Sequence, residues 1–213
     1  PVFIALFTYA LIDNMPKFVM ETALSYDNQL YFNALYFPAQ AILLTVGFVY
    51  KPLLVRMAQM WADAEKRNRF HLVILAIVAM VIALTLVVIF LMGWIGIPIM
   101  SFMYGVDFEQ FRGLSFIMIA AGGVTAIIDF LYQVITVLRR QKSVMKLYVI
   151  TFGFSLFVPI LLIDFTGLPG AVIGYLIVMT ILMVLLVWEY ISICLDLSKH
   201  PVSQKPAPVS VDE

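Results

Sequence analysis

Charged residues are scarce in this sequence. Only 12% of its 213 positions are Asp, Glu, Lys or Arg, whereas about 25% is usual for a soluble domain. The 13 basic and 13 acidic residues cancel to a net charge of zero, which excludes the basic surface that a nucleic-acid-binding protein needs to displace counterions. The composition is instead 63% hydrophobic, with a mean hydropathy of +1.03. These values indicate a membrane protein.

Reactive and metal-binding side chains are also scarce. The single cysteine, Cys194, excludes a disulfide framework and a cysteine-ligated zinc cluster. His71 and His200 have no Cys or second His at ligand spacing. Asp107 and Glu109 would diverge on a helix, and the sequence contains neither a G-x-S-x-G motif nor a P-loop. We therefore expect no metal, no cofactor and no enzyme active site.

Six segments are apolar enough to cross a bilayer, which takes about 20 helical residues. They cover residues 1–12, 30–51, 70–93, 113–138, 147–163 and 169–192. Period-two alternation typical of strands is absent, so the predicted fold class is all-α, a polytopic bundle of about six transmembrane helices. The bundle is expected over residues 1–198, and residues 199–213, with three prolines among polar residues, are expected to form a disordered cytoplasmic tail.

The first span is short, and the sequence begins with Pro1 already inside an apolar run. It has no initiator Met and no basic region typical of a signal peptide. We therefore expect a helix truncated at its N-terminal end, within a longer protein.

Basic residues are distributed unevenly among the segments between spans. Lys17 and Arg112 lie on one side of the predicted membrane, and eleven Lys and Arg residues lie on the other. Because basic residues accumulate in short cytoplasmic loops, we expect both ends of the sequence to be cytoplasmic. Attraction to anionic headgroups would also make membrane lipid a partner of these clusters. The eleven are Lys51, Arg56, Lys66, Arg67, Arg69, Arg139, Arg140, Lys142, Lys146, Lys199 and Lys205.

The fourth span carries a stripe of polar and small residues. One residue of this stripe, Asp129, is a carboxylate within the span. Placing a carboxylate inside the membrane costs about 2.5–3.5 kcal/mol on insertion scales, so Asp129 should face the bundle interior. Two interpretations remain open: an ion or proton coupling site, and a structural Asp that is hydrogen-bonded to a neighbouring helix. The stripe consists of Ser115, Gly122, Asp129 and Thr136 at intervals of seven, with Thr125 and Gln133 between them.

The other spans differ in how polar they are. In the second span Asn33 and Gln40 share a face with Tyr36 or Phe37. Apart from His71 at its entrance, the third span has Thr85 as its one polar side chain, so we expect a peripheral helix facing lipid. In the sixth span Gly170 begins a G-x-x-x-G pair, which we interpret as a helix-packing contact.

The first span is followed by the string D-N-M-P-K-F at residues 13–18. Because a residue before proline disfavours helical geometry, we expect Pro16 to break the helix there. Asn14 and Lys17 then become candidates for contact with a polar or anionic substrate. The alternative for Lys17 is a lysine that extends its charge to the membrane surface.

Several strings occur together in a characteristic order. They are N-M-P-K-F at residues 14–18, P-L-L at 52–54, M-A-Q-M-W at 57–61, Y-G-V-D-F at 104–108 and V-L-R-R-Q-K at 137–142. In this order and at these spacings they resemble the C-terminal half of bacterial polysaccharide-biosynthesis membrane proteins. These are the Wzx-type oligosaccharide flippases of the MATE-like superfamily. The resemblance covers the sequence except for its tail.

The resemblance implies one lobe of a two-lobe transporter in the bacterial inner membrane, with the N-terminal half of the same protein as the partner lobe. Such proteins move undecaprenyl-pyrophosphate-linked oligosaccharide between leaflets by alternating access. This implies a polar cavity, for which the candidates are Asn14, Lys17, Asn33, Gln40, Thr125 and Gln133, with Asp129 as the candidate coupling site. The sequence has no arginine within a span, so most of a cationic cavity's charge would come from the other lobe.

Two other functions remain open. A MATE-type drug or cation antiporter would share the fold, but it requires a cavity rich in carboxylates. A non-transporting membrane scaffold for polysaccharide assembly would require no polar cavity.

Overall fold

The computed structural model describes residues 2–199, so the predicted tail lies outside the described residues except for Lys199, which ends a helix. These residues form helices and connecting turns, without a strand among them. The α-helices are α1 (Val2–Ala23), α2 (Tyr26–Tyr50), α3 (Leu54–Ala62), α4 (Arg67–Leu91), α5 (Ile97–Tyr104), α6 (Arg112–Val137), α7 (Gln141–Thr166) and α8 (Leu168–Lys199). Between them lie three short 3-10 helices, η1 (Lys51–Leu53), η2 (Ala64–Lys66) and η4 (Phe108–Phe111), and a π-helix, η3 (Met92–Gly96).

Six helical stretches are long and apolar enough to span a membrane, which confirms the predicted fold class. Each predicted span corresponds to one of these stretches, but most helices extend further at their ends. α2 begins at Tyr26, four residues before the predicted start, and α7 ends at Thr166 instead of residue 163. The polar residues at these ends continue the helical hydrogen bonding beyond the apolar run that marks a span in the sequence.

The predicted break at Pro16 is wrong. α1 has 22 residues and continues through Pro16 to Ala23, so the predicted end at residue 12 is also wrong. A proline inside a helix removes one backbone hydrogen bond, and the buried position of Pro16 against the rest of the lobe compensates for that loss. As a result Asp13, Asn14 and Lys17 lie on a continuous membrane helix.

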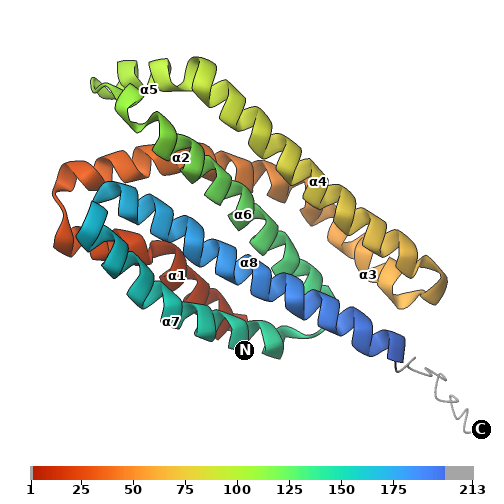
Figure 1. Cartoon of the computed structure of the whole chain (residues 1–213). Helices are drawn as coiled ribbons and strands as arrows, with labels where there is room; N and C mark the ends of the chain where they lie inside the picture. The colour runs from red at the N-terminus through yellow and green to blue at the C-terminus, as the bar shows by residue number, and fades with distance from the viewer. Residues whose placement is uncertain (1, 200–213) are drawn as a thin grey trace, which may run out of the picture.

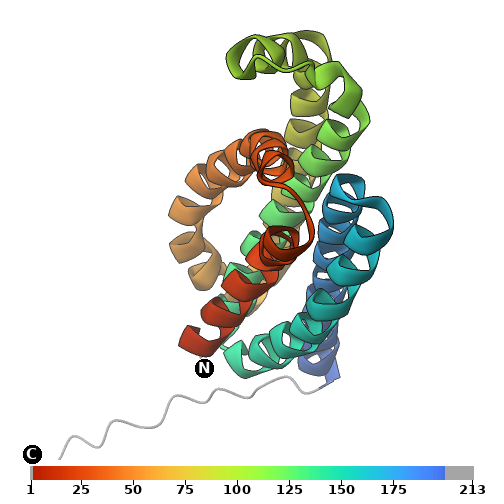
Figure 2. The ribbon, with the colours of Figure 1, turned by 90° about the vertical axis from the view of Figure 1, so that its left-hand side faces the viewer.

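The spanning helices form an arc, which Figures 1 and 2 show from two sides. α7 packs between α1 and α8, and α6 packs between α8 and α2. α1 and α2 stand at the two ends of the arc and meet over a much shorter length than α1 and α7 or α2 and α6 do. The side of the lobe between α1 and α2, called the open side below, is therefore less closely packed than the rest of the arc.

α6 is the central helix, as its polar stripe predicts. Its small residues allow close packing on both sides: a Cβ atom added at Gly122 would meet the backbone of Ala39 in α2, and one added at Gly123 would meet Thr85 in α4. Gly122 of the predicted stripe is thus a packing position between helices, and Ser115 and Thr125 of the stripe are buried as well.

α4 is the peripheral helix that the sequence predicts. It buries one narrow stripe, including Phe70, Ile77 and Thr85, and exposes large apolar residues on the rest of its surface. The helix-packing interpretation of the sixth span is also confirmed, because Gly170 lies directly against the carbonyl group of Leu162 in α7.

The two ends of the lobe differ in charge. The basic segments around α3 and the α6–α7 turn lie toward the same end as the start of α1 and the end of α8, whereas α5 and the α7–α8 turn lie at the opposite end (Figure 1).

Candidate functional site

The most connected polar centre of the lobe surrounds Asp13. The hydroxyl of Tyr36 in α2 donates to Asp13 Oδ1 at 3.0 Å, and the hydroxyl of Tyr175 in α8 donates to the same oxygen at 2.7 Å. Both tyrosines are buried, with exposed fractions of 6% and 1%. One carboxylate therefore joins α1, α2 and α8 where α1 and α2 approach each other.

The hydroxyl protons of this centre are fully used. Tyr36 and Tyr175 each have one hydroxyl proton, and both protons go to Asp13, so the 3.2 Å approach between their oxygens carries no proton. Thr125 donates its own proton to the carbonyl of Ala121 at 2.9 Å, while its oxygen lies 3.4 Å from the Tyr175 hydroxyl. The charge of Asp13 is therefore compensated by two hydroxyl donors.

Lys17 and Asn14 lie beside this centre. The Lys17 ammonium donates to Asn14 Oδ1 at 3.3 Å and stands 4.8 Å from the centre of the Tyr36 ring, a cation–π distance. Asn14 in turn donates to the carbonyl of Ala10 at 2.9 Å. Both side chains are half-buried, so the ammonium group remains partly available to an anionic group on the surface of the lobe.

Asp129 occupies a second centre. The hydroxyl of Tyr50, at the end of α2, donates to Asp129 Oδ2, and the Tyr50 ring packs on Phe130 with ring centres 5.4 Å apart. Asp129 is half-buried, and Tyr50 is fully buried. The expectation that Asp129 faces the bundle interior is confirmed, with α2 as its partner helix. Its role, coupling or structural, stays a prediction.

Three tyrosines lie between the helix segments that carry the two carboxylates. Tyr9 of α1 packs against Tyr148 of α7 with ring centres 5.7 Å apart, and Tyr148 stacks on Tyr132 of α6 at 6.1 Å. Tyr9 is one turn before Asp13, and Tyr132 is three residues after Asp129. The interior between the two centres is therefore lined with aromatic rings that carry hydroxyl groups.

The remaining candidates separate into exposed and interior positions. Asn33 and Gln40 of α2 are exposed together with Phe37, while Tyr36 turns inward. Thr125 is buried beside Tyr175, and Gln133 is half-buried on α6. The structure thus brings Thr125, Lys17 and Asn14 to the Asp13 centre and leaves Asn33 and Gln40 on the open side of the lobe.

Sequence reasoning did not propose Asp13, Tyr50 or Tyr175 as site residues, and it named Tyr36 only as one of two alternatives on the face of Asn33 and Gln40. A usable signal was present, because Asp13 is a carboxylate one helical turn from Lys17, but the predicted break at Pro16 removed both from the membrane. The tyrosines gave no signal of their own, because buried tyrosine is common in helix cores and its partners are distant in sequence.

Four surface hollows among the described residues lie away from these centres. Two adjoin the end of α4 and η3, one lies at the end of α8, and one lies at the α6–α7 turn. Within the described residues no three His, Cys, Asp or Glu side chains are grouped as a metal site.

No protein-family model, curated protein or solved structure matches the chain.

Proposed function

We propose that this chain forms one lobe of a transporter that flips undecaprenyl-pyrophosphate-linked oligosaccharide across the bacterial plasma membrane for surface polysaccharide synthesis. The N-terminal half of the same protein supplies the second lobe. The basic segments face the cytoplasm, as do the start of α1 and the end of α8. The chain acts as a transporter and not as an enzyme.

The main support is the polar face on the α1–α2 side of the lobe. Asn33 and Gln40 are exposed on an apolar helix, and amide groups facing hydrocarbon have no hydrogen-bonding partner. Lys17 and Asn14 adjoin the same side through Tyr36. Such a face requires water, a polar substrate or a second lobe, and a cleft between two lobes provides all three.

A pyrophosphate group does not cross hydrocarbon unaided, because burial of an uncompensated charge is prohibitively costly. In the proposed cycle the headgroup passes along the polar face, with Lys17 as its cationic contact on this lobe, while the lipid tail stays in the bilayer. The Asp13 centre and Asp129 are the candidate proton or cation sites that drive the change between lobe orientations.

A MATE-type cation antiporter is the second candidate, and one observation favours it. The lobe holds two intramembrane carboxylates, Asp13 and Asp129, each with tyrosine donors. A carboxylate-rich interior suits a cationic substrate, so the comparison between lipid-linked oligosaccharide and a cationic dye must be made directly.

The test is rescue of a bacterial strain that lacks its oligosaccharide flippase by the full-length protein. Lys17→Gln and Gln40→Leu should abolish or strongly reduce surface polysaccharide at normal membrane levels of protein. Thr45→Val is the matched control, because the exposed Thr45 hydroxyl bonds only to its own helix. Efflux of a cationic dye without rescue would favour the antiporter, and failure of both assays would favour the scaffold.

A further inference from the structure

The helix that begins with α4 is too long for the bilayer. α4 alone has 25 residues and is about 37 Å long, longer than the roughly 30 Å hydrocarbon core. Five residues of η3 and eight of α5 follow without interruption, and their sequence, M-G-W-I-G-I-P-I-M-S-F-M-Y, has no charged residue. A straight continuation would carry this apolar segment out into water.

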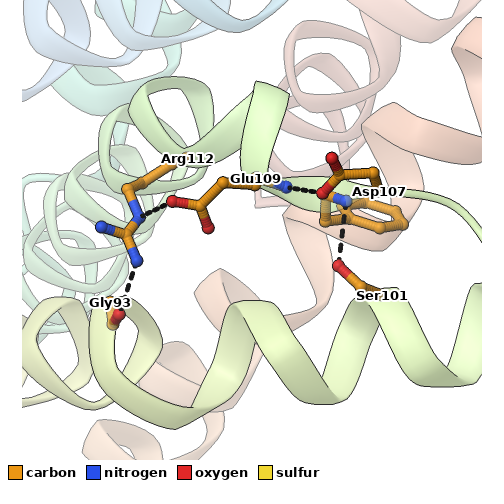
Figure 3. Close-up of polar contacts among 6 residues, drawn as sticks. Gly93, Ser101, Asp107, Glu109 and Arg112 are labelled. Atoms are coloured by element: carbon orange, nitrogen blue, oxygen red, sulfur yellow. Dashed lines mark hydrogen bonds and ion pairs between the residues drawn. The ribbon is translucent and has the colours of Figure 1, made fainter.

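The π-helix η3 changes the direction of the chain at this point. The backbone N–H of Ile97 donates to the carbonyl of Met92, five residues back, and Pro98 has no N–H to donate. The carbonyl of Gly93 is thereby left without its usual helical donor. Arg112 Nη2 donates to that carbonyl at 3.0 Å (Figure 3). A side chain of α6 thus replaces the hydrogen bond that the bend removes.

The C-terminal end of α5 is also held by hydrogen bonds. Gly105 ends the helix in a left-handed conformation, with φ of 66°, and its N–H donates to the carbonyl of Ser101 at 3.0 Å. The Ser101 hydroxyl accepts from the backbone N–H of Phe108 at 2.9 Å (Figure 3). Figure 2 shows α5 turned across the end of the lobe instead of continuing along α4.

One face of α5 packs on the protein and the other is apolar and uncovered. Ile97 and Met100 are buried, whereas Trp94, Phe102 and Met103 are 69%, 90% and 71% exposed. This uncovered face continues the exposed apolar face of α4. Trp and other amphipathic aromatics concentrate at the boundary between headgroups and acyl chains.

We propose that η3, α5 and η4, residues 92–111, form an interfacial foot that lies along the lipid headgroup boundary at the end of the lobe opposite the basic loops. The apolar face of α5 inserts among the upper acyl chains. The ion pair between Arg112 Nε and Glu109, 3.0 Å apart, and the side chain of Asp107 remain on the aqueous side. The occupant of this surface is lipid, and the inference does not depend on what the lobe transports.

The foot is also connected to the open side of the lobe. Tyr31 of α2 packs against Phe111 and Phe108, with ring centres 5.1 Å and 6.0 Å apart. Tyr31 precedes Tyr36 on the same helix by five residues. The depth of the foot in the lipid boundary therefore sets the position of the outer end of α2.

Tryptophan fluorescence in vesicles measures this depth. In a Trp61→Phe, Trp188→Phe background, Trp94 is the single tryptophan; a second protein adds Trp94→Phe and Phe102→Trp. Both proteins are reconstituted in phosphatidylcholine–phosphatidylglycerol vesicles whose acyl chains carry bromine either near the headgroup or near the chain end. Ile82→Trp, added to a protein without the three native tryptophans, is the control for the membrane interior.

We expect the tryptophans at positions 94 and 102 to be quenched more by the shallow bromine than by the deep one, and to a similar extent. The control at position 82 should show the reverse. In a straight helix position 102 would lie about 12 Å beyond position 94. Its tryptophan would then emit at longer wavelength and be quenched by aqueous iodide instead of by bromolipid, which would overturn the proposal. Quenching as deep as at position 82 contradicts it, and so does protection from both quenchers, which would indicate cover by another protein surface.

Discussion

Asp13 and Asp129 are both carboxylates on membrane-spanning helices, yet they differ in how many helices they join. Asp13 Oδ1 accepts from tyrosines of α2 and α8, and Lys17 stands beside one of those rings. Asp129 accepts from one tyrosine of α2. A change in the protonation or ligation of Asp13 therefore acts on three helices at once, whereas Asp129 acts on the contact between α2 and α6. Asp13 is accordingly the stronger candidate for driving a movement of the lobe.

The largest effect is expected for Asp13→Asn. Asparagine keeps the shape and one acceptor oxygen but loses the negative charge, and a hydrogen bond to a charged group contributes about 1.5–3 kcal/mol. Transport by the full-length protein in proteoliposomes should fall about 10- to 100-fold. Asp164→Asn, at an exposed position near the end of α7, is the control and should transport normally.

Asp129→Asn should have a smaller effect. Asp129 accepts a hydrogen bond from one tyrosine instead of two. The transport rate of this variant is therefore expected to fall by about tenfold or less, measured in the same vesicles and normalised to inserted protein. A greater loss than in Asp13→Asn would reverse the ranking of the two centres. Full activity would identify Asp129 as structural.

Gly122→Ala tests the packing of α2 against α6 instead of the charge of either carboxylate. The added methyl group would meet the backbone of Ala39, so α2 must move away from α6. Overpacking of this kind costs about 1–3 kcal/mol, which thermal unfolding in detergent micelles would detect. Gly153→Ala has no atom within 4 Å of the added group and should unfold like the parent protein. Equal melting temperatures for the two variants would contradict the close α2–α6 contact.

Removal of single hydroxyls should change the free energy of unfolding by a similar amount. Tyr36→Phe and Tyr50→Phe each delete one donor to a carboxylate, and a hydrogen bond to a charged group contributes about 1.5–3 kcal/mol. A double-mutant cycle of Tyr36→Phe with Asp13→Asn should show coupling, because the two groups share a hydrogen bond. Independent effects would show that this bond is absent in the membrane.

The smallest effect is expected for Asp63, a carboxylate exposed to water. A hydrogen bond from Lys66 and then the backbone N–H of Glu65 lower its pKa below the usual range of aspartate. The stability that it contributes is present at neutral pH and is lost as the pH falls through that lowered pKa. Asp63→Asn should leave the melting temperature and transport unchanged, because exposed ion pairs contribute little. A clear loss of transport would show that the region of α3 has a role beyond topology.

Much of the fold could be predicted from the sequence because membrane helices are specified by length and hydropathy. Six spans, a peripheral α4 and an inward-facing α6 follow from the positions of apolar and polar residues. The exact helix ends do not, because polar residues at a membrane boundary can continue a helix as easily as end it. Pro16 shows the same limit, since packing in the folded lobe overrides a local preference.

The candidate site could be predicted only in part. The stripe on α6 indicates which face of that helix meets protein, so the interior position of Asp129 could be inferred. The stripe does not indicate which helix supplies the hydrogen-bond donor to Asp129. That donor, Tyr50, is 79 positions away in the sequence. The Asp13 centre joins residues up to 162 positions apart. Contacts of that range depend on the order in which helices pack, which periodicity does not encode.

The central claim, that the open α1–α2 side faces a water-filled cleft in the proposed transporter, is tested most directly by thiol accessibility. In a Cys194→Ser background, Gln40→Cys on α2 and Ile82→Cys on α4 are treated with a membrane-impermeant thiol reagent in intact cells and in inverted vesicles. We predict rapid labelling at position 40 in at least one of the two preparations and none at position 82, which is exposed on the lipid-facing surface of α4. Absence of labelling at position 40 in both preparations would contradict the claim, since that side of the lobe would then face lipid.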